Sequence, residues 1–131
     1  MSSEFIELHD SDVESVQIEN RIEATIDMKV LIHKSDGIAG RDPGTEWMQH
    51  ARLTSKEIWA HSHIYSEERS IIDGILVLGE KAYPNEMPTS ISHSGYFYLS
   101  LIYGDGGSFS ISGKGLYLAL LGEPSFLQEF E

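Results

Sequence analysis

The sequence predicts an all-β fold: an antiparallel β-sandwich or partly open barrel of about eight short strands, with little or no helix. Apolar residues recur at every second position in several segments, and Gly, Pro, Asn and Asp separate these segments at short intervals. No long segment repeats at the helical period, and the crossover helices that a parallel sheet requires are missing from the pattern. The length of 131 residues suits one domain, so we expect a single β domain over residues 1–131.

The first half of the chain carries the clearest strand signal. Six apolar residues share one parity, which predicts a strand with one buried face: Ile22, Ala24, Ile26, Met28, Val30 and Ile32. A β-branched run precedes them, and Glu19-Asn20-Arg21 is typical of a tight turn, so residues 12–33 are predicted to form a hairpin. Residues 35–46 are rich in turn residues and are expected to form a loop.

The second half is predicted to add several strands. These are residues 47–59, 70–79, 96–103, 108–112 and 116–121. Tyr96–Tyr103 is apolar at both parities, which predicts a central strand covered on both faces. Gly113-Lys-Gly115 is expected to turn or bulge the chain. Residues 62–69 and 81–94 are polar or contain proline, and we expect a loop and an irregular connection there.

The strongest compositional signal is a net charge of −12, with 21 acidic residues against nine basic ones. Such a surface repels nucleic acid and anionic membranes and attracts basic partners, although acidity also serves solubility alone. The absence of cysteine excludes disulfides, thiol catalysis and cysteine-ligated metals, and it fits a reducing cytosol. No secretory signal pattern or long apolar segment is present. We therefore expect a cytoplasmic protein that binds neither nucleic acid nor membrane.

Acidic residues are concentrated near the start of the chain, where residues 1–23 hold seven acids and one base. We predict that Asp10, Asp12 and Glu14 contact a partner. Trp47 is predicted to join them as an exposed aromatic residue, because it directly follows a Gly-rich loop; the alternative is that it packs in the core. His9-Asp10-Ser11-Asp12 has the groups for acid–base or cation chemistry, and it is equally typical of a capped turn.

A metal site is predicted at His61 and His63, because residues two apart on an extended chain project from the same face. His50 or His93 would complete the set, and solvated loop histidines are the alternative explanation. We expect no cofactor: the sequence has no phosphate loop, nucleophile elbow, zinc-protease helix motif or dinucleotide fingerprint.

Two stretches resemble uncharacterised families of small bacterial β proteins. Phe5-x-x-x-His9-Asp10-Ser11-x-Val13 resembles their N-terminal "HD-S/A" strand opening. The segment from Gly104-Asp-Gly to Phe130 resembles their closing strands, and together the stretches cover about a third of the chain. Some of these families are linked to polymorphic-toxin immunity. The resemblance implies a sandwich or barrel-like domain from a bacterial cytosol with an inhibitor-like role, and it assigns no site residues.

The predicted function is therefore a non-enzymatic, acidic protein-binding domain, immunity- or inhibitor-like, that engages a basic partner. Two alternatives stay open. One is a small-ligand or metal-binding β-barrel, which as an enzyme would use His9, Asp10 and the pair His61/His63. The other is a homo-oligomeric structural subunit that associates through Tyr96–Tyr103 or through an edge strand.

Overall fold

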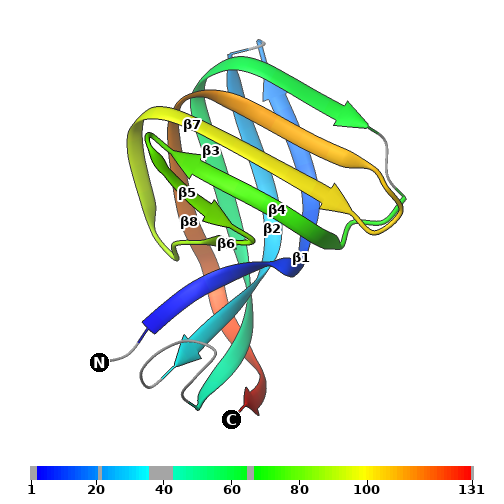
Figure 1. Ribbon diagram of the computed structural model, residues 1–131, viewed down its shortest axis with the longest axis vertical. Helices are drawn as coiled ribbons and strands as arrows, with labels where there is room; N and C mark the ends of the chain where they lie inside the picture. Colours follow the sequence, from blue (N-terminus) through cyan, green and yellow to red (C-terminus); the bar gives the residue numbers. More distant parts are fainter. Residues whose placement is uncertain (1–2, 21, 36–42, 65–66, 131) are drawn as a thin grey trace.

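The computed structural model describes residues 3–20, 22–35, 43–64 and 67–130, and these form one antiparallel sheet of eight strands without a helix (Figure 1). The strands are β1 (Ser3–Glu19), β2 (Glu23–Ser35), β3 (Gly44–Ile64), β4 (Ile71–Leu78), β5 (Lys81–Pro84), β6 (Glu86–Met87), β7 (Ile91–Tyr103) and β8 (Ser108–Phe130). Their order in the sheet is β5-β4-β7-β8-β3-β2-β1-β6, and the sheet does not close into a barrel. The predicted fold class is confirmed. No helix of the described residues has the length and apolar character needed to cross a membrane.

The strands are longer than the sequence pattern predicts. β3 has 21 residues and β8 has 23, and they pair along their lengths from Gly44 opposite Phe130 to Ile64 opposite Ser108. Three register shifts interrupt this pairing, and such bulges let a strand bend without ending. Gly113-Lys-Gly115 is therefore a bend inside β8, where two separate short strands were predicted.

β3 and β8 divide the sheet into two halves that face each other. The β1 half contains β1, β2, residues 44–55 of β3 and residues 116–130 of β8. The β7 half contains β4, β7, residues 58–64 of β3 and residues 108–114 of β8. In Figure 1, β4 and β7 cross in front of the upright strands β1 and β2. Both halves are continuous because β3 and β8 run through each of them.

The core fills the space between the two halves. Its largest fully buried side chains include Phe97, Phe109, Ile26, Met28 and Leu53. Five of the six residues predicted to be buried on β2 and its approach are buried, but Ile22 is 53% exposed. Ile22 lies just before β2, in the connection between β1 and β2.

β7 is covered on one face only, contrary to the prediction. Phe97, Leu99 and Leu101 are fully buried, whereas Tyr96 and Ile102 are 43% and 40% exposed. β7 is central in the sheet, between β4 and β8, but its second face points outward. The apolar residues at the second parity of β7 therefore form part of an uncharged outer surface and not a second buried face.

Short contacts join β1 to the opposite end of the sheet. Asp12 forms an isolated bridge with Ser70, and the Val13 N–H donates to the Arg69 carbonyl at 3.0 Å.

The two-residue strand β6 adds to the N-terminal part of β1 and places Met87 over the end of the core. Loop or irregular structure is the wrong prediction for residues 44–46 and 62–64, which belong to β3, and for residues 81–84, 86–87 and 91–94, which belong to β5, β6 and β7. Residues 36–42 and 65–66 of the predicted loops lie outside those that the structure describes.

Candidate functional site

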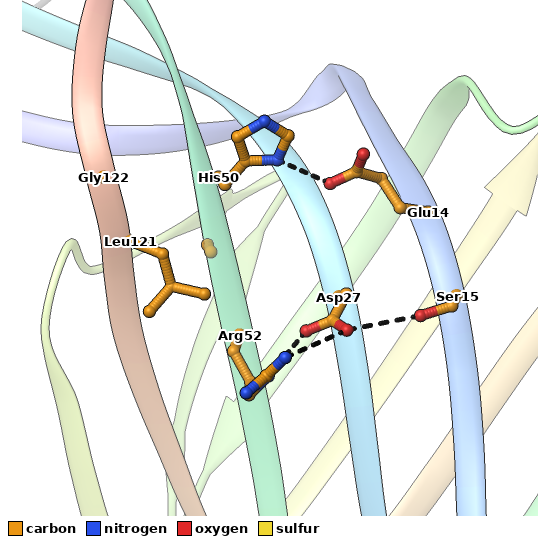
Figure 2. A pocket seen from close by; sticks show the side chains of 8 residues that line it. Glu14, Ser15, Asp27, His50, Arg52, Leu121 and Gly122 are labelled. Carbon is orange, nitrogen blue, oxygen red and sulfur yellow. Dashed lines mark hydrogen bonds and ion pairs between the residues drawn. The ribbon is translucent and has the colours of Figure 1, made fainter.

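An open groove of about 440 Å³ lies on the outward face of the β1 half (Figure 2). It is lined by Glu14, Ser15, Asp27, His50, Ala51, Arg52, Leu121 and Gly122, which come from β1, β2, β3 and β8. The strand register places Ser15 opposite Asp27 and Asp27 opposite Arg52 in one row across the sheet. Residues opposite one another share a face, so three separate strands contribute polar side chains to one groove.

Glu14 enters the groove because of a bulge in β1. The register shifts between Val13 and Ser15, so Glu14 is the extra residue of the strand. Its Oε1 lies 2.7 Å from Nδ1 of His50, and the contact spans from β1 to β3 (Figure 2). Both side chains are exposed. When His50 is neutral, Glu14 contributes a full negative charge to the groove.

The second polar pair of the groove neutralises itself. Arg52 Nε lies 2.7 Å from Asp27 Oδ1, and Ser15 Oγ lies 3.4 Å from Asp27 Oδ2. The hydrogen bond from Arg52 is the main cause that holds the pKa of Asp27 below its usual value, while partial burial opposes it. The same hydrogen bond raises the pKa of Arg52. Both groups therefore stay ionised near neutral pH, and their charges cancel.

The wall beside these polar groups is apolar. Leu121 is 38% exposed and stands opposite His50 on β8. The adjacent Gly122 carbonyl accepts a hydrogen bond from Gln49 Nε2 at 2.9 Å. The groove thus combines an exposed carboxylate, that of Glu14, with an aliphatic surface. This combination suits the side chain of arginine or lysine, whose apolar stem ends in a cation.

Of the acidic residues predicted to contact a partner, Glu14 is the one that lines the groove. Asp12 accepts a hydrogen bond from Ser70 Oγ at 2.8 Å and helps to join the ends of the sheet. Asp10 is exposed, has a positive φ of 72° and lies 3.2 Å from His9 Nδ1. Asp12 therefore has a structural contact, and Asp10 remains open to solvent beside it.

The turn interpretation fits the segment His9-Asp10-Ser11-Asp12. The register of β1 shifts between Glu7 and Asp12, so this segment bulges out of the strand. Ser11 is fully buried: its hydroxyl donates to the Glu7 carbonyl at 2.5 Å and accepts from the Leu31 N–H at 3.0 Å. Ser11, one of the residues in the predicted capped turn, thus holds the bulge in place through these two hydrogen bonds.

Trp47 is half-buried, contrary to the prediction of an exposed aromatic residue. It packs against the core, edge-on to Phe126 at 5.2 Å between ring centroids, with Lys34 Nζ 5.2 Å from its ring. The reason is register, because Trp47 stands opposite the buried Ile32 on the inward face. The exposed tryptophan is Trp59, at 57%.

His61 and His63 lie near the end of β3, both exposed. They stand opposite the buried residues Ile111 and Phe109, so they share one face as predicted. Within residues 3–20, 22–35, 43–64 and 67–130, no three or more His, Asp or Glu side chains form a group that could hold a metal. Neither predicted third ligand joins them: His50 lines the groove, and His93 bonds to the Tyr96 carbonyl at 2.8 Å.

A second cavity of about 330 Å³ lies beside His63, where β1 and the β7 half diverge. Its other lining residues are Val13, Glu14, Ser15, Val16, Glu68, Arg69 and Tyr103. Burial raises the pKa of Tyr103, and the nearby Arg69 charge opposes this effect. The cavity therefore has a neutral phenol and ionisable side chains of both signs. His9 and Asp10 are not among its lining residues, so it does not assemble the predicted enzyme site.

Sequence reasoning missed a cluster at the opposite end of the β1 half. His33 Nε2 lies 2.7 Å from Glu7 Oε2 and 3.6 Å from Glu46 Oε1, and its ring stacks on Phe5 at 5.1 Å. Gln128 Nε2 donates to Glu46 at 3.0 Å, so the cluster spans β1, β2, β3 and β8. Cross-strand register brings these residues together, and the residue pattern of a single strand does not reveal that register. The contacts tie four strands together in a partly buried setting.

No protein-family model, curated protein or solved structure matches the chain. Its function has to be inferred from its own residues, and the groove with Glu14 is the strongest starting point.

Proposed function

We propose that this chain is a non-enzymatic binding domain whose acidic β1 surface engages a basic protein partner, in the manner of an immunity or inhibitor protein. One observation carries the proposal. β1 holds six acidic residues and no lysine or arginine in 17 positions, and Glu14 of this strand lines an open groove. A field of one sign beside a concave surface attracts and orients partners of the opposite sign.

The groove supplies the specific contact within this acidic field. Asp27 is ion-paired with Arg52, whereas the Glu14 carboxylate contacts His50, and the guanidinium of Arg69 bonds to the Glu14 backbone carbonyl. An arginine of the partner would donate hydrogen bonds to Glu14 while its aliphatic stem packs on Leu121. Charge of this kind acts mainly on the association rate, so binding weakens as salt screens the surface.

The contact is testable with a short arginine-rich peptide and the isotopically labelled chain. We expect amide chemical-shift changes centred on Ser15, Asp27 and Leu121. We expect Glu14→Gln to weaken binding by up to about fivefold, the range for one exposed ion pair. The matched control is Glu19→Gln, which removes the same charge from the same strand outside the groove. Equal weakening by both variants, or shifts spread evenly over the acidic residues, would contradict the proposed contact.

A natural partner is tested by co-purification from the native host at low and high salt. A basic protein that is retained at low salt, released at high salt and recovered in smaller amount with Glu14→Gln supports the proposal. Recovery of no partner under either condition counts against it. We further propose a cytoplasmic setting, which the absence of cysteine supports.

A further inference from the structure

The last part of β3, residues 59–64, forms an open edge of the sheet. On one side these residues pair with β8. β2 pairs with β3 only as far as Ser55, and the Ile58 N–H still donates to the Ile22 carbonyl at 2.8 Å. Beyond Ile58, none of the residues the structure describes pairs with the second side. Alternate residues of this segment therefore present backbone groups to the open edge that no described residue pairs with.

This edge lacks the charged side chains and prolines that often prevent strand pairing; a bulge between Ile58 and Ala60 lies at its start, and residues 60–64 follow in continuous register with β8. Proteins protect edges with charged side chains, prolines or covering segments. The segment Trp59-Ala-His-Ser-His-Ile64 contains no charged residue and no proline, and all six side chains are exposed. Trp59 and Ile64 are 57% and 59% exposed. An edge of this kind is complementary to another extended strand.

The charges of the chain indicate which kind of strand can pair with the edge of β3. A basic partner is drawn to the acidic β1 surface, but the edge of β3 offers it no opposite charge. A second copy of the chain carries the same charge of −12, so like-charged surfaces must stay apart when two copies associate. If two copies pair their uncharged β3 edges around a two-fold axis, their acidic surfaces can stay apart.

We propose that two copies of this chain join edge to edge along residues 59–64, and that His61 and His63 of both copies together bind one zinc ion. Centred on Ser62, the antiparallel pair sets Ala60 opposite the second copy's Ile64, and His61 opposite the second copy's His63. Because His61 and His63 share a face, all four imidazoles lie on the same side of the joined sheet.

The spacing of this arrangement suits a metal. Directly opposed residues have Cβ atoms roughly 5 Å apart, and alternate residues of one strand are roughly 7 Å apart. Neutral imidazole is a good zinc ligand, and zinc prefers four ligands in a tetrahedron. One chain supplies two histidines, so the site is incomplete without the second copy. The ion would also offset part of the repulsion between two acidic chains.

The surroundings of the pair favour a cation. His63 lies edge-on to Phe109 at 5.7 Å between ring centroids, which fixes one side of its ring. The cavity beside it is lined by Glu14 and Glu68, with Arg69 as its one basic residue. None of the carboxylates in the described part of the chain forms an ion pair with His61 or His63. The imidazoles are thus available to a metal.

Light scattering during size-exclusion chromatography, with zinc and with a chelator, tests the metal. We expect a mass near 14.7 kDa in chelator and about twice that mass in zinc, with one zinc per two chains. His61→Gln/His63→Gln should remain monomeric in zinc. The matched control His9→Gln/His93→Gln should still dimerise. A mass unchanged by zinc, or a control that loses dimerisation equally, overturns the metal site.

A charge swap tests the strand pairing itself. Ala60→Lys/Ile64→Lys sets like charges opposite each other at both ends of the joined strands, and we expect it to stay monomeric in zinc. Ala60→Lys/Ile64→Glu sets opposite charges in the same places, and we expect it to dimerise. Dimers from both variants would overturn the edge as the interface, and monomers from both would overturn this register. Peptide binding at Glu14 is assayed on the chelated monomer, so either proposal can fail alone.

Discussion

Replacing Gly113 by alanine tests how closely β3 and β8 cross between the two halves of the sheet. Gly113 is buried opposite Ile58, and a Cβ there would lie 2.0 Å from the Glu57 carbonyl oxygen and 3.0 Å from Ile58 Cα. Ordinary contact begins near 3.4 Å, so β3 would have to move away from β8. Overpacking a core costs typically 1–3 kcal/mol, and a backbone obstacle belongs at the upper end, about 3 kcal/mol. With an unfolding entropy of about 2.1 cal/mol/K per residue, the thermal midpoint falls by about 11 °C.

The assay is thermal unfolding followed by circular dichroism, with Gly104→Ala as the matched control. A Cβ at Gly104 would meet Glu68 Oε2 at 2.1 Å, but this atom is the end of an exposed side chain, whereas the obstacle at Gly113 is backbone. We expect Gly104→Ala to change the free energy of unfolding by less than about 1 kcal/mol. If Gly113→Ala proved as stable as this control, the close crossing would be refuted.

Three buried hydroxyl groups give further tests. Ser11→Ala should lower the free energy of unfolding by about 1–3 kcal/mol, because it leaves a buried N–H without its acceptor. Ser55→Ala should raise the free energy of unfolding by up to about 1 kcal/mol, because no described residue offers the buried Ser55 hydroxyl a hydrogen bond. Urea unfolding measures the change for both serine variants. A loss of stability in Ser55→Ala would contradict the expected gain. Burial raises the pKa of Tyr103, so the folded state loses stability as the pH rises above about 10, where an unfolded tyrosine ionises. Tyr103→Phe should lose less stability over that range, and identical alkaline profiles would show that Tyr103 ionises freely.

The alternation of apolar residues was sufficient to predict the antiparallel β class and most of the buried face of β2. The alternation of apolar residues did not predict where the strands end. Bulges let β3 and β8 continue past points that have the composition of turns, such as Gly113-Lys-Gly115. Composition also suggested two buried faces for β7, because tyrosine and isoleucine suit both cores and uncharged outer surfaces.

The site was predictable only in part, for a related reason. The acidic character of β1 is a property of the sequence, and it pointed to Glu14. Its neighbours in the groove, Asp27, His50 and Arg52, come from two other strands and meet Glu14 only through register. Trp47 was predicted to be exposed because it follows a loop, and that position says nothing about which residue it opposes on the neighbouring strand. Pairing between strands carries the information that single-strand patterns lack.

The strands shared by both halves also govern how the chain reaches its fold. β3 cannot complete its pairing until β8 is present, since Ile64 pairs with Ser108 and Gly44 with Phe130. Residues so distant along the chain can pair only after a long loop has closed. The entropy lost on loop closure comes before the stabilising contacts form, and this slows folding. Neither half can form first as an independent nucleus with all its strands. Folding is therefore expected to be slow and all-or-none, with the unpaired edges of β3 exposed to other chains until β8 docks.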